Sequence, residues 1–221
     1  MPTLFLRMSA ASGVLFVALW FGAFFFSGGF PDLTASQSQL ASDYAHYAGR
    51  LWAGDHMSRL SVVFLVLFLA GVWLVLQRSE AGTGWLSAVA LGSGLLFAGL
   101  ILLGVLFPAV ARELGACAGG APPASGCDFG RQHVDAYVFS VLYSLTGAVE
   151  VLAITPLSVL LGAVAAVVLS KRALPRWLGW SAAGLAVLAL AASAFDVIFP
   201  IYLLFALWVL GTSAVLVRWR V

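Results

Sequence analysis

Residues 58–77 read SRLSVVFLVLFLAGVWLVLQ, and residues 60–76 within this run contain no charged side chain. A transmembrane α-helix needs about 20 predominantly apolar residues to cross a hydrocarbon core roughly 30 Å thick. Strands of a membrane barrel instead alternate apolar and polar residues over about 10 positions, whereas this run is apolar throughout. The stretch therefore predicts a helix that crosses a membrane.

Five further apolar runs flank this one, and the longest of them contains an internal proline, Pro156. Together they predict an all-α fold, a six-transmembrane-helix bundle in a single domain, with spans at 4–27, 58–77, 85–107, 135–169, 177–195 and 201–217. The composition agrees, because 62% of the 221 residues are hydrophobic and 9% are charged, whereas a soluble domain carries roughly 25% charged residues. A net charge of +2 without a basic run argues against a nucleic-acid partner.

Two long polar stretches, 28–57 and 108–134, are expected to be loops, the first with room for a short helix. Gly28, Gly29 and Pro31 end the first helix, and Pro108 is expected to end the third. The 35 residues of the fourth helix would extend about 52 Å, well beyond the hydrocarbon core. We therefore expect residues 135–146 to project from the membrane and to pack against residues 32–57 in a small extracytoplasmic cap; a strong tilt of the helix is the alternative.

The orientation follows from the positions of Lys and Arg, which are enriched in cytoplasmic loops. Four of the eleven fall in the two long polar stretches or at their edge, and seven fall at the opposite ends of the predicted helices: Arg7, Arg78, Lys171, Arg172, Arg176, Arg218 and Arg220. Both termini are therefore predicted to be cytoplasmic and both long stretches to be outside. This is the pattern of a multi-pass protein of a bacterial inner membrane.

The two cysteines, Cys117 and Cys127, both lie in the second long polar stretch. Their spacing does not match the short cysteine pairs of zinc knuckles or thioredoxin-like motifs. A disulfide within an outer loop is the simplest interpretation, because disulfides persist in oxidising compartments. A reactive or metal-binding pair, or two free thiols, are the alternatives.

All three histidines, His46, His56 and His133, lie on the predicted outer side, and Asp43 and Asp55 lie near two of them in sequence. Imidazole and carboxylate groups are ligands for zinc, copper or iron, so a metal or haem site is one hypothesis. No spacing matches a known zinc-hydrolase motif. The simpler interpretation is a hydrogen-bonded and salt-bridged outer cap, and a proton-linked or ligand-binding site is the third.

Glu150 and Asp196 are the acidic residues most deeply embedded in apolar sequence. A carboxylate in the bilayer is costly and usually faces the interior of the bundle or water. Together with Tyr143, Asp135 and Arg59, these two acids are candidates for an outward-facing polar pocket that binds a ligand or a proton. In the structural alternative, Asp196 caps a turn and Glu150 bonds to a neighbour such as Arg59 or a serine.

Residues 174–180 read LPRWLGW and are followed by a helix rich in Gly, Ala and Leu. This turn and the helix layout resemble an uncharacterised family of bacterial six-helix integral membrane proteins, known only as a domain of unknown function. The resemblance implies a six-helix membrane fold over most of the chain. It implies no activity, so no functional residues carry over, and the cysteine loop has no counterpart in it.

No nucleophile elbow or phosphate-binding loop occurs in the sequence, so an enzyme is the less favoured interpretation. The leading hypothesis is an accessory, sensor or ligand- or lipid-binding membrane protein with an outward-facing polar pocket. The alternatives are a metal-dependent membrane enzyme that uses the His/Asp/Glu cluster, and a small proton-coupled transporter that uses Glu150. The expected partners are membrane lipids, with a larger membrane complex or a homo-oligomer also considered.

Overall fold

The computed structural model of the chain describes residues 2–27, 37–80, 82, 84–118, 136–195 and 198–218. In this part of the chain there are six α-helices and no strand: α1 (Pro2–Ser27), α2 (Gln37–Glu80), α3 (Trp85–Ala118), α4 (Ala136–Lys171), α5 (Arg176–Ala194) and α6 (Phe199–Arg218). Each helix contains a stretch long and apolar enough to cross a membrane. The predicted all-α class with six apolar helices is confirmed, and these helices suggest a multi-pass membrane protein.

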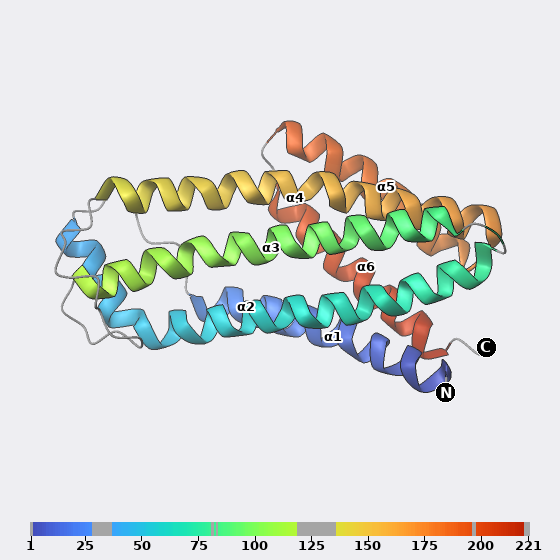
Figure 1. Ribbon diagram of the computed structural model, residues 1–221, viewed down its shortest axis with the longest axis horizontal. Helices are drawn as coiled ribbons and strands as arrows, with labels where there is room; N and C mark the ends of the chain where they lie inside the picture. The colour runs from blue at the N-terminus through green and yellow to red at the C-terminus, as the bar shows by residue number, and fades with distance from the viewer. Residues whose placement is uncertain are drawn as a thin grey trace.

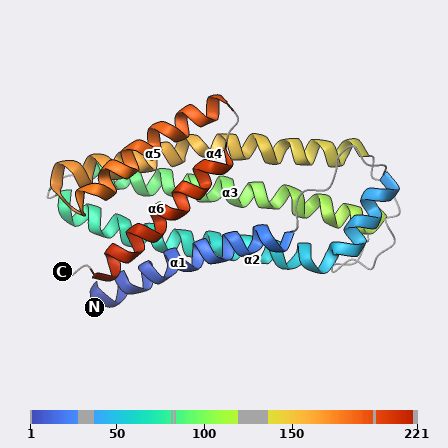
Figure 2. The same cartoon turned by 180° about the vertical axis from the view of Figure 1, so that it is seen from behind.

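The helices form a closed ring in two layers. Each helix packs against the next along the chain, α6 packs back against α1, and α2 also contacts α4. One layer contains α2, α3 and α4, and the other contains α1, α6 and α5, with α6 running obliquely across the bundle (Figures 1 and 2). Helix α1 begins and helix α6 ends at the same end of the bundle, as an even number of crossings requires (Figure 1).

The helical boundaries differ from the predicted ones at the two long polar stretches. Helix α2 begins at Gln37, so most of the predicted 28–57 loop is helical. Helix α3 continues through Pro108 to Ala118, so the predicted 108–134 loop begins with three helical turns. Polar side chains mark where a segment leaves hydrocarbon, but they do not end a helix in water. A proline removes one helical hydrogen bond, and neighbouring groups in a membrane bundle can make up for it.

Helices α2, α3 and α4 are much longer than the other three. They contain 44, 34 and 36 residues, against a need of about 20 to cross the hydrocarbon. The apolar windows cover Gly49–Glu80, Trp85–Val110 and Ser144–Lys171, and the remaining turns of all three helices lie at the end of the bundle opposite α1's start (Figure 1). The expected projection of the start of α4 therefore has counterparts in α2 and α3. Whether this end is the outer face stays a prediction.

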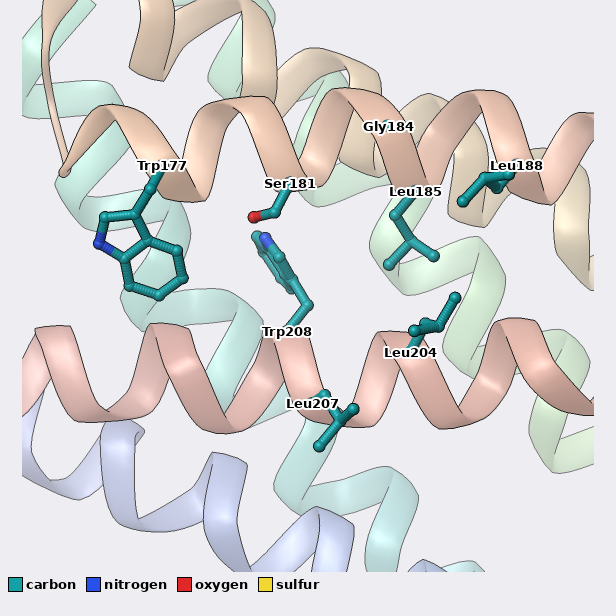
Figure 3. A pocket seen from close by; sticks show the side chains of 8 residues that line it. All are labelled: Trp177, Ser181, Gly184, Leu185, Leu188, Leu204, Leu207 and Trp208. Atoms are coloured by element: carbon teal, nitrogen blue, oxygen red, sulfur yellow. The ribbon is translucent and has the colours of Figure 1, made fainter.

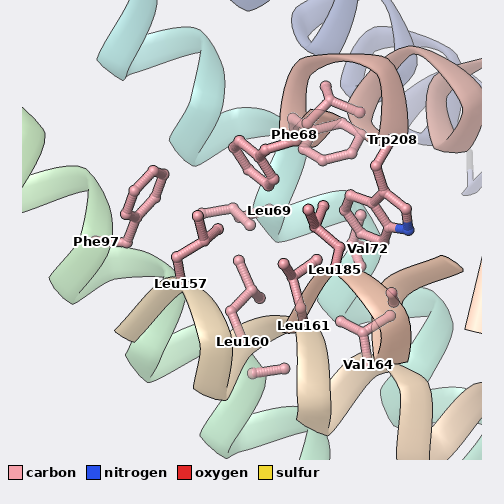
Figure 4. Close-up of a cluster of buried hydrophobic side chains, with 14 of the residues drawn as sticks. Phe68, Leu69, Val72, Phe97, Leu157, Leu160, Leu161, Val164, Leu185 and Trp208 are labelled. Carbon is pink, nitrogen blue, oxygen red and sulfur yellow. The ribbon is translucent and has the colours of Figure 1, made fainter. Parts of the chain in front are cut away.

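The core of the bundle is apolar and so is much of its surface. Phe68, Leu157 and Leu161 are fully buried, and Leu185 and Trp208 from the other layer are buried near them (Figure 4). Large apolar side chains also face outward, with Phe195 78% exposed. In water such a surface would drive aggregation, whereas lipid chains solvate it.

Close helix contacts are made where small residues lie in α1, α2 and α6. The Ser9 hydroxyl donates to the Phe68 carbonyl oxygen over 3.0 Å. A Cβ added at Gly71 would collide with Ser9, and one added at Gly13 would collide with the Ser213 hydroxyl and approach Phe68 Cδ2 to 2.7 Å. Small residues allow this approach of backbones in a membrane bundle.

Two turns at the end where the chain begins carry specific backbone contacts. The Ser87 backbone N–H donates to Glu80 Oε2 over 3.0 Å, so the carboxylate caps the first turn of α3. Arg172 follows the end of α4 in the left-handed conformation with φ 54°, and its N–H donates to the Val168 carbonyl over 3.0 Å. Both contacts satisfy backbone groups that a helix end leaves without an intrahelical partner.

Candidate functional site

Glu150 lies inside the apolar window of α4 and is half-buried. It is 21 residues from Lys171 in the sequence, which corresponds to about 31 Å along a helix. The hydrocarbon core is about 30 Å thick. If Lys171 marks one edge of the core, Glu150 is close to the other edge, where a proton can reach it from water.

Three helices meet at Glu150. A Cβ added at Gly104 of α3 would lie 3.9 Å from Glu150 Cγ, so the side chain lies in the α3–α4 contact. The hydroxyl of Tyr202 on α6 donates to the backbone carbonyl oxygen of Glu150 over 3.2 Å. A Cβ at Gly104 would make only an ordinary contact with the glutamate, and the tyrosine ties α6 to α4 at the same residue.

Aromatic rings hold Tyr202 in place. Its side chain is 7% exposed. Its ring packs edge-on against Trp20 of α1, with centroids 5.3 Å apart, and lies 6.4 Å from the ring of Phe97 of α3. Phe205, one turn further along α6, contacts Phe97 and Phe16. The hydroxyl of Tyr202 is thus a fixed polar group within an apolar cluster.

The Glu150 carboxyl itself makes no hydrogen bond and no ion pair with any residue that the structure describes. Arg59, a predicted partner, is exposed on α2 and makes no such contact with it. The alternative in which Glu150 bonds to Arg59 or a serine is therefore not found in this part of the chain. Burial without a partner leaves a carboxylate charge uncompensated, which is costly in a medium of low dielectric constant.

The other residues of the predicted pocket fall outside what the structure describes. These are Asp135, Asp196 and the side chain of Tyr143. Their convergence on Glu150 stays a prediction. Tyr202 and Gly104 were not predicted, although a tyrosine within the apolar run 201–217 was a signal that the polar group of α6 has a partner in another helix.

The histidines of the predicted metal site are only partly described. His46 and His56 are exposed on α2. Nδ1 of His56 lies 2.9 Å from the Trp52 carbonyl oxygen, and its ring lies against the Trp52 indole at an interplanar angle of 33°, with centroids 3.9 Å apart. His133 and the side chain of Asp43 lie outside the described residues.

Among the described residues, no three His, Cys, Asp or Glu side chains form a group that could hold a metal ion; Asp55, half-buried on α2, is therefore in no such group. The side chain of Cys117 and all of Cys127 are also outside the described part. The predicted metal site and the predicted disulfide both stay predictions.

A groove of about 360 Å³ lies between α5 and α6. Its walls are mostly apolar, and Trp177, Ser181 and Leu185 of α5 face Leu204 and Trp208 of α6 across it (Figure 3). The groove lies among residues of the apolar windows of both helices. It is separate from the Glu150 contact, since neither Glu150 nor Tyr202 lines it.

Comparison of the chain with known protein families, with curated proteins and with solved structures found no match.

Proposed function

We propose that this chain is a proton-sensing membrane protein in which Glu150 takes up and releases a proton. The observation that carries the proposal is a half-buried carboxyl inside a membrane-spanning helix, with no hydrogen-bond or ion-pair partner among the described residues. Acidic groups at such positions usually mark proton or ion pathways. A proton neutralises the carboxylate and needs no cavity, which suits a side chain packed between helices.

Through Tyr202, protonation of Glu150 affects the contact between two helices. With Glu150 neutral, the tyrosine hydroxyl donates to the backbone carbonyl of the same residue, as observed. With Glu150 ionised, the carboxylate becomes a stronger acceptor than the carbonyl, because hydrogen bonds to charged groups are roughly twice as strong. The hydroxyl then moves to the carboxylate, and the contact between α4 and α6 changes with the charge.

The proposal includes the predicted orientation, with the basic end of the bundle in the cytoplasm of a bacterial cell. Supporting it, the chain's first helix begins and its last helix ends at that end (Figure 1). Arg78, Lys171 and Arg176 are exposed there, as are Trp85 and Trp177. Basic residues favour the cytoplasmic side, and tryptophans gather at membrane interfaces. Glu150 then faces the outer half of the membrane and senses outside pH.

A distance measurement between α4 and α6 tests this function. Val159 of α4 and Leu203 of α6 are exposed, so a spin label at each disturbs no core contact, with both native cysteines changed to serine. In lipid nanodiscs, we expect the distance distribution to shift between mildly acidic and mildly alkaline buffer.

The same labels in Glu150→Gln should show one distribution at both pH values, because glutamine carries no charge. Asp55→Asn, a change of an acid on another helix, serves as the matched control and should keep the shift. A distribution that ignores pH in the unchanged protein, or a shift that survives Glu150→Gln, would contradict a sensor based on this carboxyl.

A further inference from the structure

The groove between α5 and α6 is the second feature of the bundle with the character of a binding site. Trp177, Ser181 and Leu185 point into it from α5, and Leu204 and Trp208 point into it from α6 (Figure 3). It is open along one side, since Trp177 is 54% exposed and Leu207 is 57% exposed. Because both helices are candidate membrane spans, that open side faces lipid.

The groove has the length of one half of a membrane. It runs from Trp177 to Leu188 along α5, eleven residues or about 16 Å. Half of a hydrocarbon core roughly 30 Å thick is about 15 Å. A lipid chain whose headgroup lies at the Trp177 end would therefore reach the other end of the groove near the middle of the bilayer.

The mostly apolar walls suit an acyl chain. Among the residues that the structure describes, no titratable side chain lines the groove. The indole N–H of Trp208 already donates to the Leu178 carbonyl oxygen over 3.4 Å. This donor therefore has an acceptor within the protein and needs none from a ligand. The Trp177 ring lies against α6, where a Cβ added at Gly211 would be 3.1 Å from Trp177 Cη2, and it bounds the groove at that end.

Exposed cations surround that same end. Arg176 precedes Trp177 directly, Arg172 lies in the turn before α5, and Arg218 ends α6. All three are exposed. A basic group at the membrane surface attracts an anionic lipid headgroup. An apolar groove one leaflet long, with exposed cations at its interfacial end, matches the shape and charge of one anionic phospholipid.

We propose that the α5–α6 groove binds an anionic phospholipid from the leaflet at the basic end of the bundle. One acyl chain lies along Ser181 and Leu185, and the headgroup phosphate pairs with Arg176. A second copy of the chain is the less favourable occupant. Copies inserted with the same orientation would bring their basic ends together in the dimer, and like charges repel.

Crosslinking with a phosphatidylglycerol that carries a photoreactive group in its acyl chain tests the proposal in nanodiscs. We expect crosslinks to concentrate on the groove residues of α5 and α6. Gly184→Leu should remove most of them, because Gly184 lines the groove and a Cβ there meets no atom within 4 Å, so the larger side chain starts from an open position and occupies the groove. Gly99→Leu makes the same change at an open position of α3 and should leave the crosslinks unchanged.

The headgroup contact has its own variant. Arg176→Gln should weaken retention of phosphatidylglycerol in native mass spectrometry by about five-fold, the effect of one cation at a membrane surface. Arg78→Gln, near the end of α2, should leave the retention of phosphatidylglycerol unchanged. Crosslinks spread evenly over the lipid-facing surface, equal retention of phosphatidylcholine, or a Gly184→Leu variant that changes only the oligomeric state would each overturn the proposal.

Discussion

The hydroxyl of Tyr202 on α6 donates a hydrogen bond to the backbone carbonyl oxygen of Glu150 on α4. The two residues are 52 positions apart in the sequence, and the bond joins the two layers of the bundle. Beside it, Cγ of the Glu150 side chain lies near α3 at Gly104. One residue thus combines an interlayer contact with an ionisable group that has no partner among the described residues.

Changing Tyr202 to phenylalanine isolates that contact. The ring keeps its packing on Trp20 and Phe97, and only the hydrogen bond is lost. We expect the free energy of unfolding in detergent to fall by about 1 kcal/mol. Thermal unfolding monitored by circular dichroism measures it. Tyr202→Ala, which also removes the ring, should cost about 3 to 5 kcal/mol; equal losses for the two variants would show that the hydroxyl bond is not the relevant contact.

The close contact between α1 and α2 predicts which glycines tolerate a methyl group. Gly71→Ala places a Cβ against Ser9, so the helices must separate, and we expect a loss of about 1 to 3 kcal/mol. Gly92→Ala, where a Cβ meets nothing within 4 Å, should instead stabilise its helix by about 0.5 to 1 kcal/mol. Chemical unfolding of both variants in the same detergent measures these changes in the free energy of unfolding. A change in stability of the same sign for both variants would contradict the close packing of Gly71 against Ser9.

The cap on α3 makes Glu80 a stabilising residue. Glu80→Ala leaves the Ser87 N–H without its acceptor, and loss of a helix cap costs about 1 kcal/mol. Glu80→Gln keeps an acceptor oxygen and should cost less. A melting temperature unchanged in Glu80→Ala would mean that water replaces the carboxylate at no cost.

The left-handed backbone at Arg172 predicts a stabilising substitution. A residue with a Cβ pays roughly 1 to 2 kcal/mol for this conformation, and glycine does not. Arg172→Gly should therefore raise the melting temperature. Lys171→Gly, one residue earlier and still inside α4, should lower it. If both variants lower the melting temperature, the positive charge at this turn contributes more to stability than the left-handed backbone at Arg172 costs.

The sequence predicted the six helices because each contains an apolar run long enough to cross a membrane. It did not predict how far the helices continue. From Gln37 onward, polar residues are compatible with a helix in water, and Pro108 weakens a helix that its neighbours hold together. The apolar runs also do not show which glycines are packed: Gly94 and Gly179 lie against neighbouring leucines, whereas Gly92, Gly99 and Gly184 face open space.

The candidate site was predicted in part. Glu150 was found from the cost of a carboxylate in an apolar helix, a property of its own segment. Its neighbours depend on which helices lie side by side and how they are rotated. For that reason the sequence suggested Arg59, whereas the structure places Gly104 and Tyr202 beside Glu150.

Infrared spectroscopy of the protein in lipid nanodiscs tests most directly whether Glu150 exchanges a proton. The stretching band of a protonated carboxyl group, assigned by its absence in Glu150→Gln and its persistence in Asp55→Asn, is followed through a pH titration. Our account predicts that this band is present in acidic buffer and disappears as the pH rises, and that Tyr202→Phe shifts the midpoint. A Glu150 band of constant intensity across the pH range in which the protein stays folded would contradict it.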